Sequence, residues 1–322
     1  MTAYFVFNGD ADGICALAQL RLSAPGPGVL VTGVKRDIAL VAQVRAAPGD
    51  HVTVLDISLD VNREGLVAVL EAGAAVRYFD HHFAGKVPAH PALETHLDPA
   101  PDVCTSLLVD RYLDGKKRRW AIVGAFGDGL DEPATKLAVQ AGLGEADQTT
   151  LRELGVTLNY NAYGETVADL HVPPAVLAEE VMLSDDPLDF ARASDTYRRL
   201  GEGYKDDMEQ TRRLSPFRKA PGAVQFVLPG APWARRVSGT LANQLARANK
   251  GEAVALLSPK TEGGYLVSVR IPEQASTSAE AFCRRFPTGG GRRTAAGIND
   301  LPATELDRFA SEFEQVFART GA

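Results

Sequence analysis

The chain has 322 residues, 45% of them hydrophobic, and a formal net charge of −7 at pH 7. This length is sufficient for two globular domains, and no apolar run approaches the ~20 residues that a membrane-spanning helix needs. Three widely separated cysteines without a CxxC pair argue against a disulfide framework and against a zinc knuckle. Because no basic segment precedes the first apolar run, we expect a soluble, cytoplasmic protein with no membrane partner.

The acidic balance also argues against long duplex DNA as a partner. Proteins that hold long nucleic acids usually carry a strong basic surface. Here the arginine pairs gather late in the chain, at Arg235-Arg236, Arg284-Arg285 and Arg292-Arg293. This distribution favours a small anionic substrate that is held at a local basic patch.

Strand and helix patterns alternate over the first part of the chain. Short apolar runs predict strands at residues 3–7, 29–34, 52–57 and 74–79. Helical composition or periodicity predicts helices between them at residues 14–22, 38–46 and 61–72. The resulting order, β-α-β-α-β-α-β, is typical of a parallel sheet that is covered by helices.

The middle of the chain is mainly helical. After a proline-rich loop at 88–101, helices are predicted at residues 104–113, 120–126, 135–141, 146–163 and 174–182. A charged segment with a thin apolar stripe, residues 188–214, predicts one long connecting helix.

The remainder of the chain mixes strands and helices again. Strands are predicted at residues 224–228, 252–257 and 265–271, and helices at residues 239–248, 278–286 and 304–317. We therefore expect a first domain at 1–187, a connecting helix and linker at 188–220, and a smaller α/β domain at 221–322.

Aspartates and histidines follow the predicted strands of the first domain. Asp10 and Asp12 are two residues apart, so in an extended turn both carboxylates can face one pocket. Asp56 ends the third strand, where an unpaired buried carboxylate would be costly. The fourth strand ends in Asp80-His81-His82, and Asp128 lies between two glycines after a predicted helix. Aspartates near a helix can also act as caps, but their number at strand ends favours a hard-cation site.

A second candidate site lies near the end of the chain. Three consecutive glycines are followed by two arginines and by small residues with helical composition, and a further arginine lies on a predicted strand nearby. Backbone N–H groups in such a stretch can reach an anion. We therefore expect a phosphate-binding site that consists of Arg270, Gly289, Gly290, Gly291, Arg292 and Arg293.

These motifs resemble those of the DHH phosphoesterase superfamily, whose members include RecJ-like and nanoRNase-like proteins. The resemblance rests on Asp10-Ala11-Asp12-Gly13, Asp56, Asp80-His81-His82 and Gly127-Asp128 in this order. Gly289-Gly290-Gly291 with Ala295-Ala296-Gly297 resembles the DHH-associated substrate-binding domain, so the two parts cover essentially the whole chain. The resemblance implies a parallel-sheet DHH domain with a helical insert. A long helix would join it to the smaller α/β domain, with the active site in the cleft between them.

The resemblance also implies roles for individual residues. It implies two divalent ions, Mn²⁺ or else Mg²⁺ or Co²⁺, with Asp10 on one, Asp12 on the other and Asp56 bridging both. His81 and Asp128 would complete the shell of the second ion. Asp80 would orient His81, and His82 would face the substrate phosphate, which makes Asp80, His81 and His82 the expected catalytic group.

Two positions depart from the family pattern. Members usually carry a histidine shortly before the first Asp-x-Asp, whereas this chain has Val6 and Asn8. Valine cannot ligate a metal, so Asn8 is a further candidate ligand through its amide oxygen. The glycine motif is usually followed by histidine, whereas this chain has Arg292, which keeps the positive charge and adds a two-pronged contact for phosphate.

The expected function is a Mn²⁺-dependent phosphodiesterase that hydrolyses dinucleotides or very short oligonucleotides, such as pGpG, to mononucleotides with a metal-activated water. A phosphatase for pAp-type nucleotides, a polyphosphate-cleaving enzyme and a metal-deficient sensor of a phosphorylated ligand remain as alternatives. The expected partner is a small phosphorylated substrate, and a homodimer is kept open.

Overall fold

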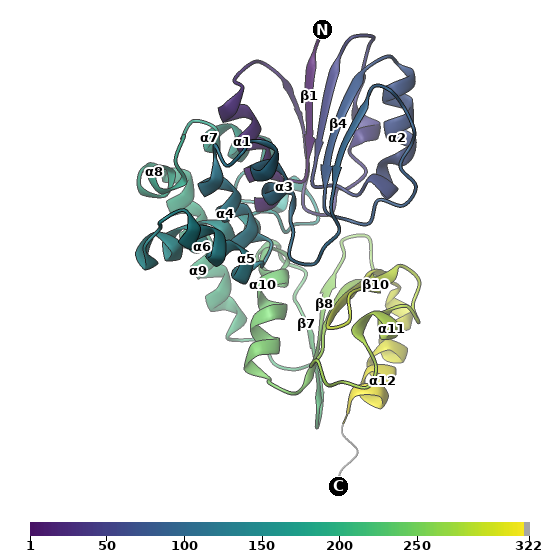
Figure 1. Ribbon diagram of the computed structural model, residues 1–322. Helices are drawn as coiled ribbons and strands as arrows, with labels where there is room; N and C mark the ends of the chain where they lie inside the picture. Colours follow the sequence, from purple (N-terminus) through teal and green to yellow (C-terminus); the bar gives the residue numbers. More distant parts are fainter. Residues whose placement is uncertain (319–322) are drawn as a thin grey trace. The chain divides into compact units, whose positions relative to one another are not determined.

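The computed structural model describes residues 1–318, and the chain divides into two compact units at Glu202 and Gly203 (Figure 1). This division falls inside the predicted connecting segment 188–220. The predicted end of the second domain, at residue 322, lies outside the described residues. Both units combine a sheet with covering helices, so the predicted α/β class is confirmed.

The first unit contains a five-stranded sheet in which every pairing is parallel. Its strands are β1 (Ala3–Phe7), β2 (Val29–Val31), β3 (His51–Leu55), β4 (Ala75–Asp80) and β5 (Leu93–Leu97), in the order β2-β1-β3-β4-β5. The predicted parallel sheet is therefore confirmed.

Successive residues along each strand point to opposite faces of the sheet, and both faces are apolar, as a sheet that is buried on both sides requires. Val6, Val54 and Tyr78 are paired across β1, β3 and β4 and pack with α2 (Leu59–Glu71). Phe7 and Phe79 belong to the opposite face, which α1 (Ala11–Ser23) and α3 (Thr105–Tyr112) cover. Figure 1 shows α2 on one side of this sheet and α1 with α3 on the other.

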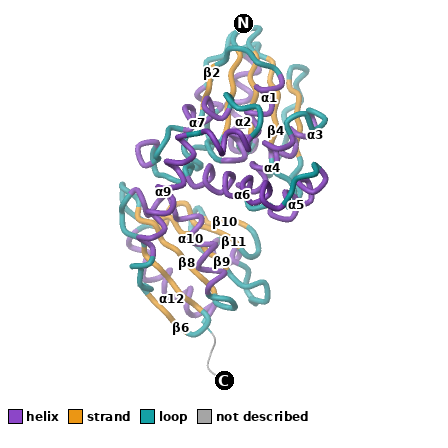
Figure 2. The backbone as a smooth tube through the Cα atoms, turned by 90° about the vertical axis from the view of Figure 1, so that its left-hand side faces the viewer, coloured by secondary structure: helices purple, strands orange, loops and turns teal. Residues whose placement is uncertain are grey.

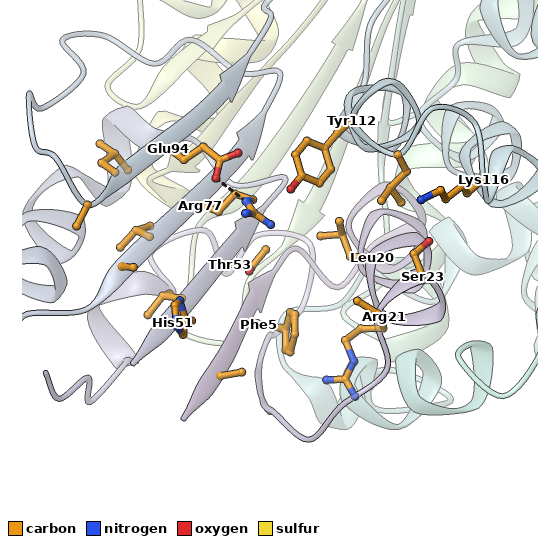
Figure 3. A pocket seen from close by; sticks show the side chains of 18 of the residues that line it. Phe5, Leu20, Arg21, Ser23, His51, Thr53, Arg77, Glu94, Tyr112 and Lys116 are labelled. Atoms are coloured by element: carbon orange, nitrogen blue, oxygen red, sulfur yellow. Dashed lines mark hydrogen bonds and ion pairs between the residues drawn. The ribbon is translucent and has the colours of Figure 1, made fainter. Parts of the chain in front are cut away.

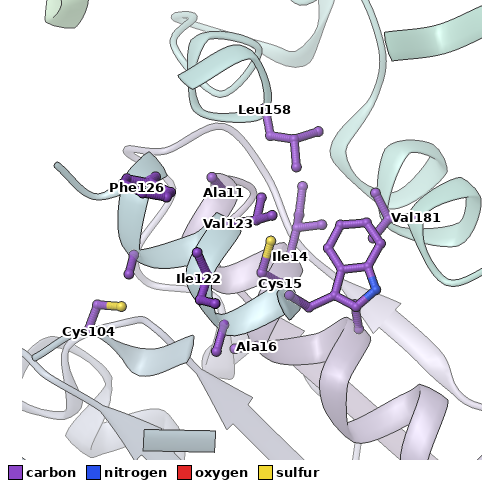
Figure 4. Close-up of a cluster of buried hydrophobic side chains, with 14 of the residues drawn as sticks. Ala11, Ile14, Cys15, Ala16, Cys104, Ile122, Val123, Phe126, Leu158 and Val181 are labelled. Atoms are coloured by element: carbon purple, nitrogen blue, oxygen red, sulfur yellow. The ribbon is translucent and has the colours of Figure 1, made fainter. Parts of the chain in front are cut away.

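The predicted helical insert packs as a layer around α1. Its further helices are α4 (Arg118–Gly127), α5 (Asp131–Gln140), α6 (Glu145–Tyr160), α7 (Pro174–Val181) and α8 (Pro187–Ala193). Apolar side chains from α1, α4 and α6, such as Ile14, Val123 and Leu158, form one buried cluster (Figure 4). This core fixes the start of α1, where the Asp10-x-Asp12 turn lies.

Two predictions for the first unit are wrong. Residues 38–46 are not a helix and contain only a 3₁₀ turn at Val41–Gln43, since the Asn62 side chain on α2 bonds to this segment. Its Oδ1 accepts from the Val41 N–H at 3.1 Å, and its Nδ2 donates to the Ile38 carbonyl at 2.6 Å. The predicted loop at 88–101 contains the edge strand β5, and an edge position tolerates its flanking prolines.

The second unit contains a six-stranded mixed sheet in the order β10-β11-β9-β8-β7-β6 (Figure 2). Its strands are β6 (Arg218–Ala220), β7 (Ala223–Val227), β8 (Ala253–Pro259), β9 (Tyr265–Arg270), β10 (Gly289–Gly291) and β11 (Ala295–Leu301). Its helices are α10 (Pro232–Ala248), α11 (Ala279–Cys283) and α12 (Leu306–Phe317). In its core, Phe282 of α11 packs edge to face against Phe309 and Phe313 of α12.

The predicted long helix at 188–214 is two helices, α8 and α9 (Asp195–Thr211). Ser194 separates them because its backbone is extended and its Oγ accepts from the Tyr197 N–H at 3.0 Å, as an N-cap does. Within residues 1–318, no helix is long and apolar enough to cross a membrane.

Candidate metal centre

Strand order and register bring the predicted site residues of the first unit to one edge of the sheet. Phe7, Leu55 and Phe79 are neighbours at the carboxyl ends of β1, β3 and β4. The residues that follow them therefore leave the sheet side by side, and they carry Asp10, Asp56 and the histidine pair. This is the edge at which parallel sheets place their ligands.

Asp56 lies at the centre of this group. One carboxylate oxygen of Asp56 and one ring nitrogen each of His81 and His82 lie within 4.8 Å of one another. His81 Nε2 is 3.4 Å from Asp56 Oδ1 and 4.0 Å from Asp128 Oδ2. Asp56 has a φ of 59°, a left-handed conformation that is uncommon outside glycine and that recurs at functional sites.

Each histidine of the pair has its own partner on Nδ1. His81 Nδ1 lies 2.9 Å from the Val103 carbonyl, which fixes the proton on Nδ1 and leaves Nε2 with a lone pair for a cation. His82 Nδ1 lies 2.6 Å from Asp80 Oδ1. The predicted orientation of His81 by Asp80 is thus not what the structure has, because Asp80 holds the next residue, His82.

Asp12 is held by the start of α3. The Thr105 N–H donates to its Oδ2 at 2.8 Å, and the Ser106 N–H donates to its Oδ1 at 2.7 Å. The positive end of a helix stabilises such a carboxylate. Each oxygen keeps a second lone pair, so the role of Asp12 as a metal ligand stays a prediction.

Asp10 caps α1 and pairs with a lysine that the sequence reasoning missed. Its Oδ1 accepts from the Gly13 N–H at 3.0 Å, and its Oδ2 forms an ion pair with Lys35 Nζ. Lys35 follows β2, which lies beside β1, so it reaches the same edge of the sheet. The signal that could have found it is the one used for the aspartates, a charged residue shortly after a predicted strand.

The carboxylates strongly affect one another's ionisation. Burial raises the pKa of Asp56 well above its usual range, and the nearby charges of Asp12, Asp10 and Asp128 raise it further. Burial also raises the pKa of Asp128. Burial would do the same for Asp10, but the Lys35 ammonium outweighs it and holds the pKa of Asp10 below its usual range.

The donor set fits a hard divalent cation. It consists of buried and partly buried carboxylates and one imidazole nitrogen, without a thiolate, and this combination suits Mn²⁺ or Mg²⁺. A cation among these carboxylates would relieve the repulsion that raises the pKa of Asp56. Thr105 Oγ1 donates to Asp56 Oδ1 at 3.1 Å and so orients that carboxylate.

The Asp80–His82 contact predicts a specific titration. Partial desolvation opposes the protonation of His82, but the hydrogen bond that its ring donates to Asp80 prevails and raises the pKa of His82. Protonated His82 therefore stabilises the folded chain below the unfolded-state pKa of His82. This stabilisation is lost as the pH rises through the folded-state pKa of His82. In metal-free protein, Asp80→Asn should lower the titration midpoint of His82 measured by NMR. Asp189→Asn, at an exposed position of α8, should leave it unchanged, and an equal midpoint in both variants would contradict the prediction.

The predicted phosphate site in the second unit has a different local structure from the one expected. The three glycines form β10, which pairs antiparallel with β11, so the arginines lie in a hairpin turn and no helix follows them. Arg270 ends the neighbouring strand β9, opposite Ala295. The prediction failed because small residues such as Ala295-Ala296-Gly297 resemble a helix in composition, whereas here they fit between two strands.

The three arginines of this site differ in their partners. Arg293 Nη2 donates to the carbonyls of Glu273 and Ala275 at 3.3 and 3.4 Å, and Arg270 Nε donates to Asn243 Oδ1 at 2.8 Å. Arg292 is exposed, and its guanidinium has no hydrogen-bond or ion-pair partner within residues 1–318. Arg292 is therefore available to an anion.

A cavity of about 750 Å³ lies at the opposite edge of the first sheet. It is lined from the amino-terminal parts of the strands by residues such as Phe5, His51 and Arg77 (Figure 3). Arg77 forms an ion pair there with Glu94 at 2.8 Å. None of the predicted site residues lines this cavity.

Comparisons with known proteins identify the fold. No family model matches the chain, and no curated protein matches its sequence. Its structure is similar to that of exonuclease RecJ bound to manganese, with 19% identity and a TM-score of 0.62, covering 99% of this chain and 91% of the other. It is also similar to the pGpG-specific phosphodiesterase PggH from Vibrio cholerae, with 13% identity and a TM-score of 0.57, covering 98% and 99%.

A third similar structure is an exopolyphosphatase-related protein from Bacteroides fragilis, with 15% identity and a TM-score of 0.51, covering 98% of this chain and 91% of the other. At these identities the likeness shows the fold. The chain thus shares the fold of these solved structures, and the two-part α/β fold expected from the motifs is confirmed.

Proposed function

We propose that the chain is a divalent-metal-dependent phosphoesterase, with Mn²⁺ as the ion. The observation that carries this proposal is the buried Asp56 carboxylate, with His81 Nε2 3.4 Å away and with a pKa raised by burial and by three neighbouring carboxylates. A bound cation would relieve the repulsion among these charges. The known proteins of this fold include an exonuclease bound to manganese and a phosphodiesterase.

In this proposal Asp56, His81 and Asp128 hold the ion, with Asp12 and Asp10 beside them. The ion would lower the pKa of a coordinated water and polarise the phosphoryl group. The Val103 carbonyl fixes the tautomer of His81, and Thr105 orients Asp56. His82, which Asp80 keeps protonated to a higher pH than usual, would donate to an oxygen of the phosphate.

We propose a dinucleotide or very short oligonucleotide, with pGpG first, as the substrate. Its terminal phosphate gives Arg292 an anion to bind, and the net charge of −7 suits a short substrate better than a long strand. The likeness to a pGpG-specific phosphodiesterase supports the same choice. The likeness to an exopolyphosphatase-related protein makes polyphosphate the second candidate.

The test is hydrolysis by the purified full chain with Mn²⁺. The substrates are pGpG, pAp, polyphosphate and a long single-stranded oligonucleotide, each assayed with and without a chelator. We expect pGpG to be cleaved to mononucleotides, with activity lost on chelation. Turnover of another substrate without pGpG cleavage would overturn the choice of substrate, and the absence of metal-dependent turnover with all four would overturn the enzyme.

Arg292→Ala should chiefly weaken substrate binding. The Arg292 guanidinium is exposed in a hairpin turn, and it is far in sequence from the carboxylates of the metal centre. Its loss should therefore remove binding of the substrate in the ground state. We expect KM for pGpG to rise ~10-fold, which corresponds to about 1.4 kcal/mol, with kcat nearly unchanged. Arg247→Ala, an equally exposed arginine on α10, is the matched control and should leave both constants unchanged. A loss of kcat with unchanged KM would contradict this role.

A further inference from the structure

The position that usually carries a histidine ligand is altered in this chain. The candidate positions hold Val6 and Asn8, and Asn8 Nδ2 donates to the backbone carbonyl of Lys35 at 3.3 Å. The Asn8 side chain thus ties the end of β1 to the loop after β2. This hydrogen bond positions the backbone of Lys35, and no imidazole is present at this point of the chain.

Lys35 is held on its backbone and on its side chain. Its N–H donates to the Ala162 carbonyl at 2.9 Å, and its Nζ pairs with Asp10 and donates to Asn159 Oδ1 at 3.3 Å. The ammonium also lies 5.6 Å from the centre of the Tyr163 ring, within cation–π range. Four residues, from the turn before α1 and from α6 with the loop after it, therefore hold one positive charge against the first aspartate of the site.

We propose that the Lys35 ammonium takes the place of the first of the two ions, so that the chain binds a single divalent ion among Asp56, His81 and Asp128. This inference rests on the proposed function. An ammonium and a dication repel each other, and both oxygens of Asp10 already have partners, the Gly13 N–H on Oδ1 and Lys35 Nζ on Oδ2. On the other side of the site, His81 Nε2 and Asp56 Oδ1 remain open to an ion at 3.4 Å from each other.

The alternative is that a first ion displaces Lys35. Asn8 Oδ1 is buried and has no hydrogen-bond partner among the described residues, so it could serve such an ion as a ligand. Two features favour the lysine. The amide of Asn8 is a weaker ligand than an imidazole or a carboxylate, and contacts with Asn159 and Tyr163 already hold Lys35 at Asp10. Counting the bound ions decides between these arrangements.

The experiment titrates metal-free, full-length protein with Mn²⁺ and measures the ions bound per chain by elemental analysis and by electron paramagnetic resonance. We expect wild-type protein to bind one ion with the spectrum of an isolated Mn²⁺. The double variant Asn8→His, Lys35→Ala restores the usual histidine and removes the ammonium, so it should bind two ions with a spectrum of exchange coupling. Lys250→Ala, which removes an exposed lysine, should still bind one.

The outcomes separate this inference from the proposed function. Two coupled ions in wild-type protein would overturn the inference and leave the metal-dependent enzyme standing. No bound ion, with no hydrolysis of any substrate, would overturn both. If the double variant does not fold, Lys35→Met keeps the length of the side chain without its charge and should also gain an ion. A folded Lys35→Met protein that stays at one ion would overturn the substitution of metal by lysine.

Discussion

Asp56→Asn should lower kcat/KM for pGpG by ~10³-fold or more, at 1.36 kcal/mol of barrier for each factor of ten, and should weaken Mn²⁺ binding at the same time. The reason is the central place of the Asp56 carboxylate, which faces His81 and is close to the charges of Asp10, Asp12 and Asp128. Asparagine is the better test than alanine because it tolerates the left-handed backbone at φ 59°. The change therefore removes charge with little backbone strain.

The same variant should be at least as stable as the wild type when metal is absent. Because the pKa of Asp56 is raised in the folded state, the folded chain binds a proton there more tightly than the unfolded chain does. The stabilisation that the protonated Asp56 carboxyl gives to the folded wild type is thus lost as the pH rises from its unfolded-state pKa through its folded-state pKa. Urea unfolding at neutral pH should show wild type gaining stability from Mn²⁺ and Asp56→Asn gaining little.

Asp206→Asn, an exposed carboxylate on α9, is the control and should behave as wild type in both assays. Wild-type turnover in Asp56→Asn would remove Asp56 from the metal site. Lost turnover with unchanged Mn²⁺ affinity would instead place Asp56 in a role without metal contact.

The sequence allowed the strand-end aspartates to be predicted because each ends an apolar run. Asp56 stood out since burying an unpaired carboxylate is costly, and the structure places it beside His81 as expected. The partner of Asp80 could not be predicted in the same way. Adjacent residues leave a strand end in different directions, so only the fold decides that His81 meets Val103 and His82 meets Asp80.

Lys35 shows the limit of reasoning from local pattern. Its place directly after a predicted strand marks Lys35 as a candidate for this edge of the sheet, but a single lysine there also resembles a solvated surface residue. It reaches Asp10 only because β2 pairs with β1 in parallel, which is a tertiary property. The helix predicted at residues 38–46 does not form for a related reason, because backbone groups of this segment bond to Asn62 on α2 and not along a helix.

The glycine run likewise could not be interpreted without its neighbours, and its three members have different surroundings. A Cβ at Gly289 would lie 1.9 Å from the Cys283 carbonyl oxygen and 2.4 Å from its carbon, both backbone atoms. A Cβ at Gly290 would meet no atom within 4 Å. Gly289 is therefore required by packing of the hairpin against α11, whereas Gly290 borders open space.

This difference predicts opposite results for two alanine substitutions. Gly289→Ala should destabilise the second unit by ~3 kcal/mol, the upper part of the usual range for an overpacked site, and hydrogen exchange of β9 and β11 should accelerate. Gly290→Ala should change stability by less than about 0.5 kcal/mol. On the proposal that the substrate phosphate binds at this hairpin, the added methyl group of Gly290→Ala should raise KM for pGpG ~10-fold through lost binding.

The pair of variants separates a glycine that packing needs from one that a ligand needs. A Gly290→Ala protein with wild-type KM would move the phosphate contact away from β10 and leave Arg292 to bind it from the turn. A Gly289→Ala protein as stable as wild type would mean that α11 yields to the methyl group. In that case the glycines would have to be explained by binding alone, since packing would no longer require the first of them.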